Sequence, residues 1–429
     1  MKKRRRSRLS VGTIVMLVLT ACVLAATAAF LFLIAGDGVY ERAYAAFNLL
    51  AETQKPTDAP SPEPTIKPLD TPAATVMLTA EPTAEPTPSP GLTTFTLAAA
   101  GTVYAPKAIR ESAQESGGHY DFLSVLNGIG DTLSAADLAI VTLETTTAGR
   151  EKGYGNYNTT PEILDALRAC GVDLVALATE RALDRGYDGL DLTLSELTSR
   201  SLAYAGVYPY SENGSATMMN INGVQVAVLA YSYGLSDEGK AQTKNDSRGV
   251  LALIDAQKMA QDITRARVDG ANVVIVLPHW GTKNRAETPE SVRVLANTLA
   301  QAGADVILGT HPNVAQGVER IHTVRSDGLT YETVVCYSLG CLLTDARSSE
   351  NTAGMAVNLT LVYDSNPRRA YPGEMKITPL YIASQRKDGK NVYRVVDAED
   401  EQALSKLTIA EQQSAAQAVL RVRQAVKGE

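Results

Sequence analysis

Cysteine is scarce in this sequence, with four residues among 429. Cys22 lies in an apolar segment near the amino terminus and Cys170 ends an expected helix, while Cys336 and Cys341 flank the end of one expected strand. Residues at that spacing on an extended strand lie too far apart for a disulfide, unless the turn between them folds back. We therefore expect no disulfide framework.

Positive charge is not in excess either. The 40 lysine and arginine residues are outnumbered by 47 acidic residues, which gives a formal net charge of -7. No basic stripe recurs in the part of the chain that is expected to fold, and nucleic-acid binding depends on such a surface. The composition therefore argues against nucleic acid as a partner.

Histidine is equally rare, yet two of the four histidines follow apolar runs. Residues 273–277 (Val-Val-Ile-Val-Leu) lead into Pro278-His279-Trp280, and residues 305–308 lead into Gly-Thr-His311-Pro-Asn313. Such runs predict buried strands, and the loops at strand ends carry the chemistry of layered α/β folds. The sequence thus predicts one site that holds both histidines. The alternative is that each is a hydrogen-bonded structural histidine.

The amino terminus predicts a membrane anchor. Residues 1–8 are basic and expected in the cytoplasm, whereas residues 9–36 carry no charge. About 20 apolar residues suffice to span a bilayer, and the basic end stays inside. We therefore expect a single-pass protein of the cell membrane with its folded part extracytoplasmic. A second interpretation, lipidation at Cys22 after the small-residue pattern of residues 19–22, stays open.

A stalk is expected over residues 37–91. Ten of the nineteen prolines lie in its Pro/Thr-rich segment, residues 53–90. Proline holds such a segment extended, and its composition offers too little apolar surface for a core. The pattern is typical of a linker that raises a domain above a bacterial surface.

Alternating strands and helices are predicted over residues 92–384, followed by a tail of residues 385–429 with a helix at 410–426. The expected strands are 95–100, 138–143, 174–178, 224–231, 273–277, 306–308, 333–339, 359–363 and 375–382. The expected helices between them are 161–170, 189–200, 256–269 and 288–302. This rhythm predicts one layered α/β domain.

Six motifs within this domain occur in the order typical of one family. They are residues 136–144, 177–184, 202–206, 279–281, 311–317 and 337–345. With them, residues 97–345 resemble the CapA family, poly-gamma-glutamate capsule-synthesis proteins with a metallophosphatase-like fold. The resemblance implies a four-layer α/β/β/α sandwich and a role in capsule or cell-envelope polymer biosynthesis. It also implies an anionic polymer and capsule-synthesis membrane proteins as partners.

The sequence departs from the family pattern at metal-site positions. Thr102 replaces an aspartate and Asn313 a histidine, and threonine is a poor substitute for a carboxylate ligand. By the resemblance, one of two metal sites is lost. The other is implied to hold at most one divalent ion, through His279, His311, Glu144 and Glu180.

The resemblance also assigns the remaining site residues. Arg181 takes the place of the general-acid histidine and stays charged, so it cannot cycle a proton. The catalytic positions are Arg181 and Asp184, and the expected substrate-binding residues are Lys283, Arg185, Trp280 and Asn313. Several of these residues, and Glu144, also have a purely structural interpretation: Trp280 as a packing wall, Glu144 and Asp184 as loop bridges, and the basic residues as solvated charges.

Three functions remain open. The first is a metal-dependent hydrolase or transferase that acts on a phosphate or γ-glutamyl substrate. The second is a catalytically inactive relative that binds an anionic polymer with the old cleft. The third is an architectural component of a capsule export complex.

Overall fold

The computed structural model describes residues 91–150, 153–208, 216–244, 250–325, 327–387 and 389–427. The predicted anchor at residues 9–36 lies outside these residues, as does the stalk apart from its last residue. In the described part of the chain, no helix is both long and apolar enough to cross a membrane.

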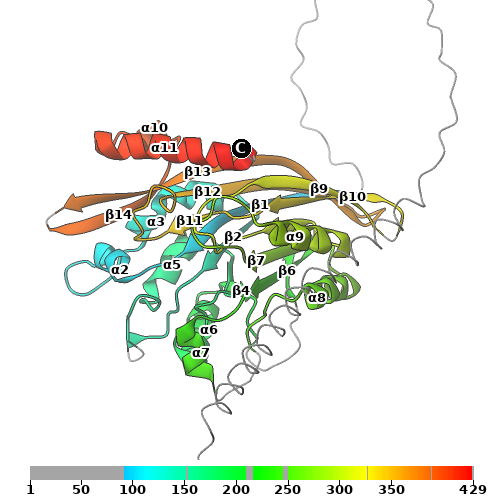
Figure 1. The fold of residues 1–429 in the computed structure, drawn as a ribbon, viewed down its shortest axis with the longest axis horizontal. Helices are drawn as coiled ribbons and strands as arrows, with labels where there is room; N and C mark the ends of the chain where they lie inside the picture. The colour runs from blue at the N-terminus through cyan, green and yellow to red at the C-terminus, as the bar shows by residue number, and fades with distance from the viewer. Residues whose placement is uncertain are drawn as a thin grey trace, which may run out of the picture. The chain divides into compact units, whose positions relative to one another are not determined.

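The first sheet has the strand order β14-β13-β12-β1-β2-β3-β4, with β11 beside β1 (Figure 1). Its members are β1 (Leu92–Val103), β2 (Leu138–Leu143), β3 (Leu174–Ala176), β4 (Ala203–Ala205), β11 (Cys341–Leu343), β12 (Ala353–Asp364), β13 (Arg369–Lys387) and β14 (Lys390–Asp397). Strands β1 to β4 pair in parallel, whereas β12, β13 and β14 form an antiparallel meander on β1.

The second sheet has the order β5-β6-β7-β8-β10-β9. Its members are β5 (Thr217–Ile221), β6 (Val224–Ser232), β7 (Val273–His279), β8 (Val306–Leu308), β9 (Val318–Val324) and β10 (Thr330–Cys336). The four central strands run parallel, and an antiparallel strand closes each edge. The carboxyl ends of β7 and β8 therefore open at the same edge of the sheet.

Helices connect most of these strands. They are α2 (Lys107–Ala113), α3 (Leu123–Leu126), the 3-10 helix η1 (Asn127–Ile129), α4 (Gly130–Ser134), α5 (Glu162–Ala169), α6 (Gly186–Ser199), α7 (Asp237–Thr243), α8 (Ala256–Val268), α9 (Glu290–Ala302), α10 (Glu401–Leu404) and α11 (Ile409–Lys427). Asp255 caps α8 by accepting from the Lys258 N–H at 2.8 Å, which satisfies one of the free donors at the helix start.

Alternation along the strands divides the apolar side chains among separate cores. In β1, Leu97 and Ala99 pack between the two sheets, whereas Ala98 and Ala100 face a core shared with the helices. This follows from the two-residue period of a strand. Helices α5 and α6 cover the outer face of the first sheet, and α8 and α9 cover the second. The mixed α/β class predicted from the sequence is confirmed.

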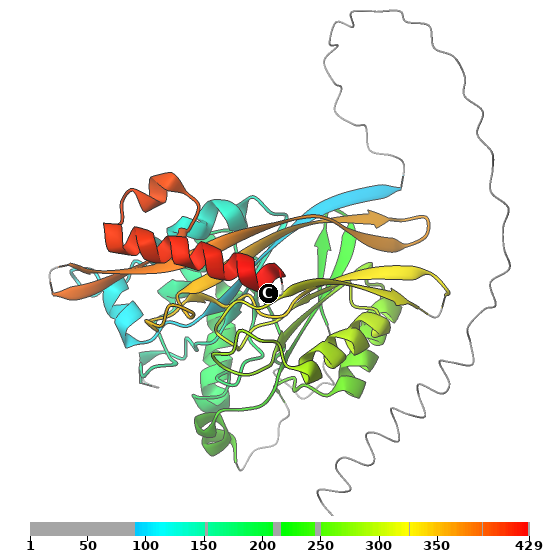
Figure 2. The same cartoon turned by 45° about the horizontal axis from the view of Figure 1, so that its top comes forward.

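The carboxyl-terminal segment is built into the first sheet. The domain boundary predicted at residue 384 falls inside β13, which pairs with β14 from Leu380 to Lys387. Helix α11 lies along this antiparallel part, as Figure 2 shows, and buries Ala415 and Ala418 against Tyr381. Residues 386–387 and 389–391 form the exposed end of the hairpin of β13 and β14.

Candidate metal centre

Two neighbouring strands of the second sheet bring His279 and His311 together. His279 is the last residue of β7, and its backbone lies beside Thr310, just after β8. The Trp280 N–H donates to the Thr310 carbonyl at 3.0 Å, and the Thr310 N–H donates to the Pro278 carbonyl at 3.0 Å. These bonds extend the parallel pairing past the end of β8 and fix the two histidine-bearing loops side by side.

The loop after β8 has an unusual backbone. A Cβ on Gly309 would lie 2.1 Å from the Tyr337 carbonyl oxygen and 2.4 Å from Trp280 Nε1, so only glycine fits. His311 has a φ of 97°, in a region that L-residues with bulky side chains rarely adopt. Such strain clusters at functional sites, because the surrounding structure must hold it in place.

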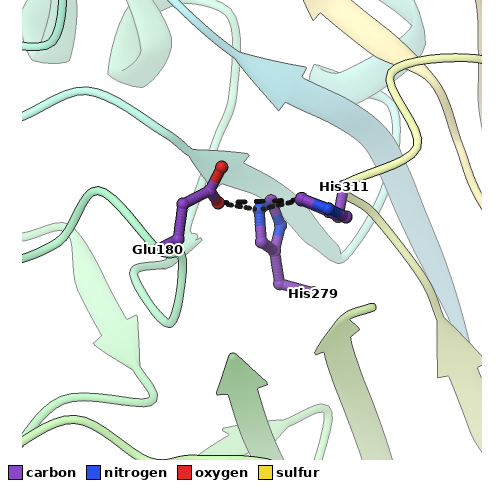
Figure 3. Close-up of side chains that lie close together, drawn as sticks. All are labelled: Glu180, His279 and His311. Carbon is purple, nitrogen blue, oxygen red and sulfur yellow. Dashed lines mark hydrogen bonds and ion pairs between the residues drawn. The ribbon is translucent and has the colours of Figure 1, made fainter. Parts of the chain in front are cut away.

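Glu180 completes a buried cluster with the two histidines (Figure 3). Its Oε2 lies 2.6 Å from His279 Nε2 and 3.7 Å from His311 Nδ1. The two ring nitrogens lie 3.3 Å apart. One ligand atom from each residue lies within 4.8 Å of the others, and none of the three side chains is more than 6% exposed. We call Glu180, His279 and His311 the metal cluster.

Thr310 orients His279 from the other side of its ring. His279 Nδ1 lies 2.9 Å from Thr310 Oγ1, and both side chains are buried. If Nε2 binds a metal ion, the ring proton sits on Nδ1 and is donated to this hydroxyl. Sequence reasoning missed Thr310, although its place between a buried strand and His311 was a signal.

Glu180 is the negative member of the metal cluster. Burial alone would raise the pKa of this carboxyl, but hydrogen bonds to His279 and His311 and the charge of Lys283 outweigh burial and lower it. Burial lowers the pKa of His279 below its ordinary value, although its bond to Glu180 opposes the shift. A neutral imidazole beside an ionised carboxylate is the state that binds a divalent ion.

Lys283 lies between Glu180 and Glu144. Its Nζ is 2.7 Å from Glu180 Oε1 and 3.6 Å from Glu144 Oε1. Burial would lower the pKa of Lys283, but the two carboxylates outweigh it and raise the value. Burial and the charge of Glu180 raise the pKa of Glu144 to about 8. Glu144, a predicted ligand, thus faces the ammonium group and stands outside the metal cluster.

Two positions at which the sequence departs from the family pattern, Thr102 and Asn313, supply no metal ligand. Thr102 is fully buried at the end of β1 opposite Cys341, and its hydroxyl has no hydrogen-bond partner among the described residues. Asn313 is half-buried, and its backbone carbonyl accepts from the Asn351 amide at 3.1 Å. Neither position supplies a carboxylate or an imidazole.

Arg181 and Asp184 form an ion pair next to the metal cluster. Arg181 Nη1 donates to Asp184 Oδ2 at 3.2 Å, its Nε lies 4.0 Å from Glu180 Oε1, and its guanidinium stacks on the Tyr157 ring at 3.8 Å. Asp184 also accepts a hydrogen bond from Ser236 Oγ. Arg181 is therefore held in place by its neighbours.

Arg185 and Trp280 do not join the metal cluster. Arg185 donates to the backbone carbonyls of Asp184 at 2.9 Å and Gly153 at 3.4 Å, so it braces a loop. Trp280 is 2% exposed in the core under β7, and its indole N–H donates to the Tyr337 carbonyl. Its packing matches the interpretation of Trp280 as a packing wall, with no ring face free for a substrate.

Tyr233 is a site residue that sequence reasoning missed. Its ring centroid lies 4.4 Å from that of His311, and half of the residue is exposed. It follows β6, whose end pairs with His279, so tertiary structure alone brings it to the site. This ring forms one exposed wall beside the two histidines.

The residues present fit one divalent ion. Two imidazole nitrogens and one carboxylate oxygen are the donor set of catalytic zinc sites, which keep a fourth position open. The hydrogen bonds that these groups now make with one another would give way to metal bonds. Among the described residues, they form the one group of three or more His, Cys, Asp or Glu side chains with ligand spacing.

Comparison with known proteins identifies chains that are similar to this one in sequence. The chain is 28% identical over 229 residues to the PGA biosynthesis protein CapA of Bacillus subtilis (strain 168), which covers 53% of this chain and 55% of that protein. It is 27% identical over 188 residues to the capsule biosynthesis protein CapA of Bacillus anthracis, 43% of each chain. The chain thus spans about half the length of these curated relatives.

A solved structure gives a weaker likeness. The calcineurin-like phosphoesterase YfkN from Bacillus subtilis aligns with a TM-score of 0.40 and 13% identity, over 78% of this chain and 97% of that chain. This is too low to support an inference about activity.

The family match is decisive for identity. Residues 96–346, more than half of the chain, match the family described as bacterial capsule synthesis protein PGA_cap. All three residues of the metal cluster lie inside this range. The chain belongs to this family of capsule synthesis proteins.

Proposed function

We propose that this protein binds a growing or exported anionic polymer of the capsule or cell envelope at a site that holds one divalent metal ion. In this proposal the site positions the polymer and has little or no phosphatase turnover. The polymer class is that of the CapA relatives, whose names refer to PGA and capsule biosynthesis.

The ammonium group of Lys283 is the observation that carries the proposal. It lies against two buried carboxylates, so it already supplies the positive charge that a second metal ion would bring. A second divalent ion there would compete with Lys283 for the same oxygens and repel it. The metal cluster on the other side of Glu180 is left for one ion.

The charges around this ion favour an anionic ligand. Lys283 is about one-third exposed, and Arg181 is about one-fifth exposed beside it. A divalent ion held by the metal cluster would polarise a carboxylate or phosphate oxygen that binds next to it. Arg181 occupies the general-acid position of the family pattern and keeps its proton, which favours binding over hydrolysis.

Further points of the proposal rest on the sequence. They are a four-layer α/β/β/α metallophosphatase-like sandwich, a transmembrane segment at residues 9–36, and a stalk that places the domain outside the cell. A protein so anchored would meet the polymer beside capsule-synthesis membrane proteins. A hydrolase or transferase acting on a phosphate or γ-glutamyl substrate is the alternative for the same site.

Polymer binding across a salt series tests the proposal. The full chain should bind poly-γ-glutamate when a divalent ion is present, with affinity that falls as salt rises, because salt screens part of the attraction. Lys283→Ala should weaken binding at least several-fold. Lys240→Ala, which removes an exposed charge on α7, is the matched control. No binding, or binding indifferent to salt and to Lys283→Ala, would refute the proposal.

A further inference from the structure

A second concentration of positive charge lies at the edge of the second sheet opposite the metal cluster. Asn272 and Asp305 immediately precede β7 and β8, so this edge carries the amino ends of the strands whose carboxyl ends lead to the two histidines. The hairpin of β9 and β10 and the hairpin of β12 and β13 lie side by side here (Figure 2).

A cavity of about 480 Å³ opens between these elements. Its charged lining consists of four arginines and one carboxylate: Arg267, Arg325, Arg368, Arg369 and Asp305. We call these residues together with Tyr331 the arginine pocket. Ligand sites commonly have this volume, between roughly 300 and 1,000 Å³.

The single carboxylate is already shared by two arginines. Asp305 is 2% exposed, accepts from Arg267 Nη2, and lies 3.7 Å from Arg325 Nη2. It also accepts from the Val274 N–H at 2.8 Å. The negative charge of Asp305 is therefore already neutralised by these partners. Arg368 and Arg369 have no counter-charge among the residues that line the cavity.

Tyr331 holds two guanidinium groups close together. The Cζ atom of Arg325 lies 4.0 Å from the ring centroid, and that of Arg369 lies 4.3 Å from the same centroid. The Tyr331 hydroxyl donates to Asp327 at 2.6 Å, which fixes the ring. Cation–π contacts thus keep two like charges, one from each sheet, at one wall of the cavity.

Some N–H donors of these arginines make no hydrogen bond within the described residues. The buried Nε–H groups of Arg325 and Arg369 find no hydrogen-bond acceptor in the described part of the chain, and neither Arg368 nor Arg369 has an ion-pair partner there. Burial and repulsion from Arg267 lower the pKa of Arg325. A buried donor without an acceptor is unfavourable, and a bound anion would satisfy it.

We propose that the arginine pocket is a second anion site, which binds a ligand carrying two or more carboxylate or phosphate groups independently of the metal cluster. The planar fork of arginine donates two parallel N–H bonds to either group, a geometry that lysine lacks. Arg369 and Arg368 from the first sheet and Arg325 from the second grip the ligand together.

Titration of two probes into the full chain tests this proposal. Pyrophosphate represents the phosphate source, and a hexaglutamate peptide represents the carboxylate source. At least one should bind with a chelator present, and binding should weaken with salt. The tighter probe identifies the source. Arg369→Ala should reduce the affinity for that probe tenfold or more. Arg369→Lys should reduce it less, because the positive charge remains although the paired N–H donors of the guanidinium are lost.

Two controls separate this site from others. Arg386→Ala removes an exposed charge near the opposite end of β13, and His279→Ala disables the metal cluster; both should leave the affinity unchanged. Thermal unfolding of each variant verifies that the fold is intact. Neither probe binding at millimolar concentration, an unchanged affinity in folded Arg369→Ala, or a loss in His279→Ala would each overturn the proposal.

Discussion

Lys283 is the residue on which the charge balance of the metal centre depends. Its ammonium lies 2.7 Å from Glu180 and 3.6 Å from Glu144, both of which are buried. From the sequence, Lys283 was predicted to bind the substrate, with a solvated charge as the alternative. Its pairing could not be predicted, because Glu144, Glu180 and Lys283 come from three loops that only the fold brings together.

A stability cycle tests the role of Lys283. Without metal, Lys283→Met should lower the free energy of unfolding by about 1–3 kcal/mol, less than for a fully buried pair since Lys283 is partly exposed. At about pH 9, above the pKa of about 8 of Glu144, the double variant Glu144→Gln/Lys283→Met should lose less, because one uncompensated charge is gone. Urea denaturation in the presence of a chelator measures both. Equal stability of Lys283→Met and wild type would show that the ammonium does not compensate these carboxylates.

Arg181 sets the expected chemistry of the site. We expect phosphomonoesterase activity on generic substrates to be very low, and Arg181→His to raise it by about 10-fold or more, since general acid catalysis typically contributes 10²–10⁴-fold. Arg185→His is the matched control, because the side chain of Arg185 binds backbone carbonyls. Wild-type turnover equal to that of relatives with an intact histidine would contradict the assignment.

At the scale of elements, the ends of β7 and β8 decide the geometry of the metal cluster. Both strands were predicted from apolar runs that end at a polar loop, and their parallel pairing explains why His279 and His311 meet. The sequence pattern could not supply the rest. Tyr233 and Thr310 reach the site through pairing of β6 with β7 and of His279 with Thr310, which no local periodicity encodes.

Substitution of Gly309 tests whether the loop after β8 has room for a side chain. Gly309→Ala should destabilise the fold by about 1–3 kcal/mol and weaken metal binding, because its Cβ would overlap the Tyr337 carbonyl and displace His311. Gly234→Ala, where nothing lies within 4 Å of the added carbon, is the matched control. Thermal unfolding and metal titration measure both effects. A variant as stable as the control would show that the loop has room to move.

At the scale of the whole molecule, the carboxyl-terminal segment completes the fold. The α/β class followed from the alternation of strands and helices, but the extent of the domain did not. The boundary predicted at residue 384 lies where β13 in fact continues, because its pairing with β14 extends to Lys387. Val422 of α11 is buried in the core between the sheets. Local sequence patterns could not predict this contact.

Truncation tests this integration. A chain that ends at Ser384 loses β14, α10 and α11 and exposes Tyr381, Ala353 and Ala383 of the core beneath α11. We expect it to aggregate or to unfold at a markedly lower temperature than the full chain, because the buried apolar area is lost. Equal melting temperatures would show that the segment is an appendage. Circular dichroism melts of both chains decide the matter.

Metal counting on the full chain tests the central account most directly. Elemental analysis after loading and desalting should find one divalent ion per chain, because Glu180, His279 and His311 form a single ligand set and Lys283 holds the neighbouring carboxylates. His279→Ala should lose this ion, whereas His322→Ala, at an exposed position on β9, should retain it. Two tightly held ions per chain, or unchanged metal content in His279→Ala, would contradict the account.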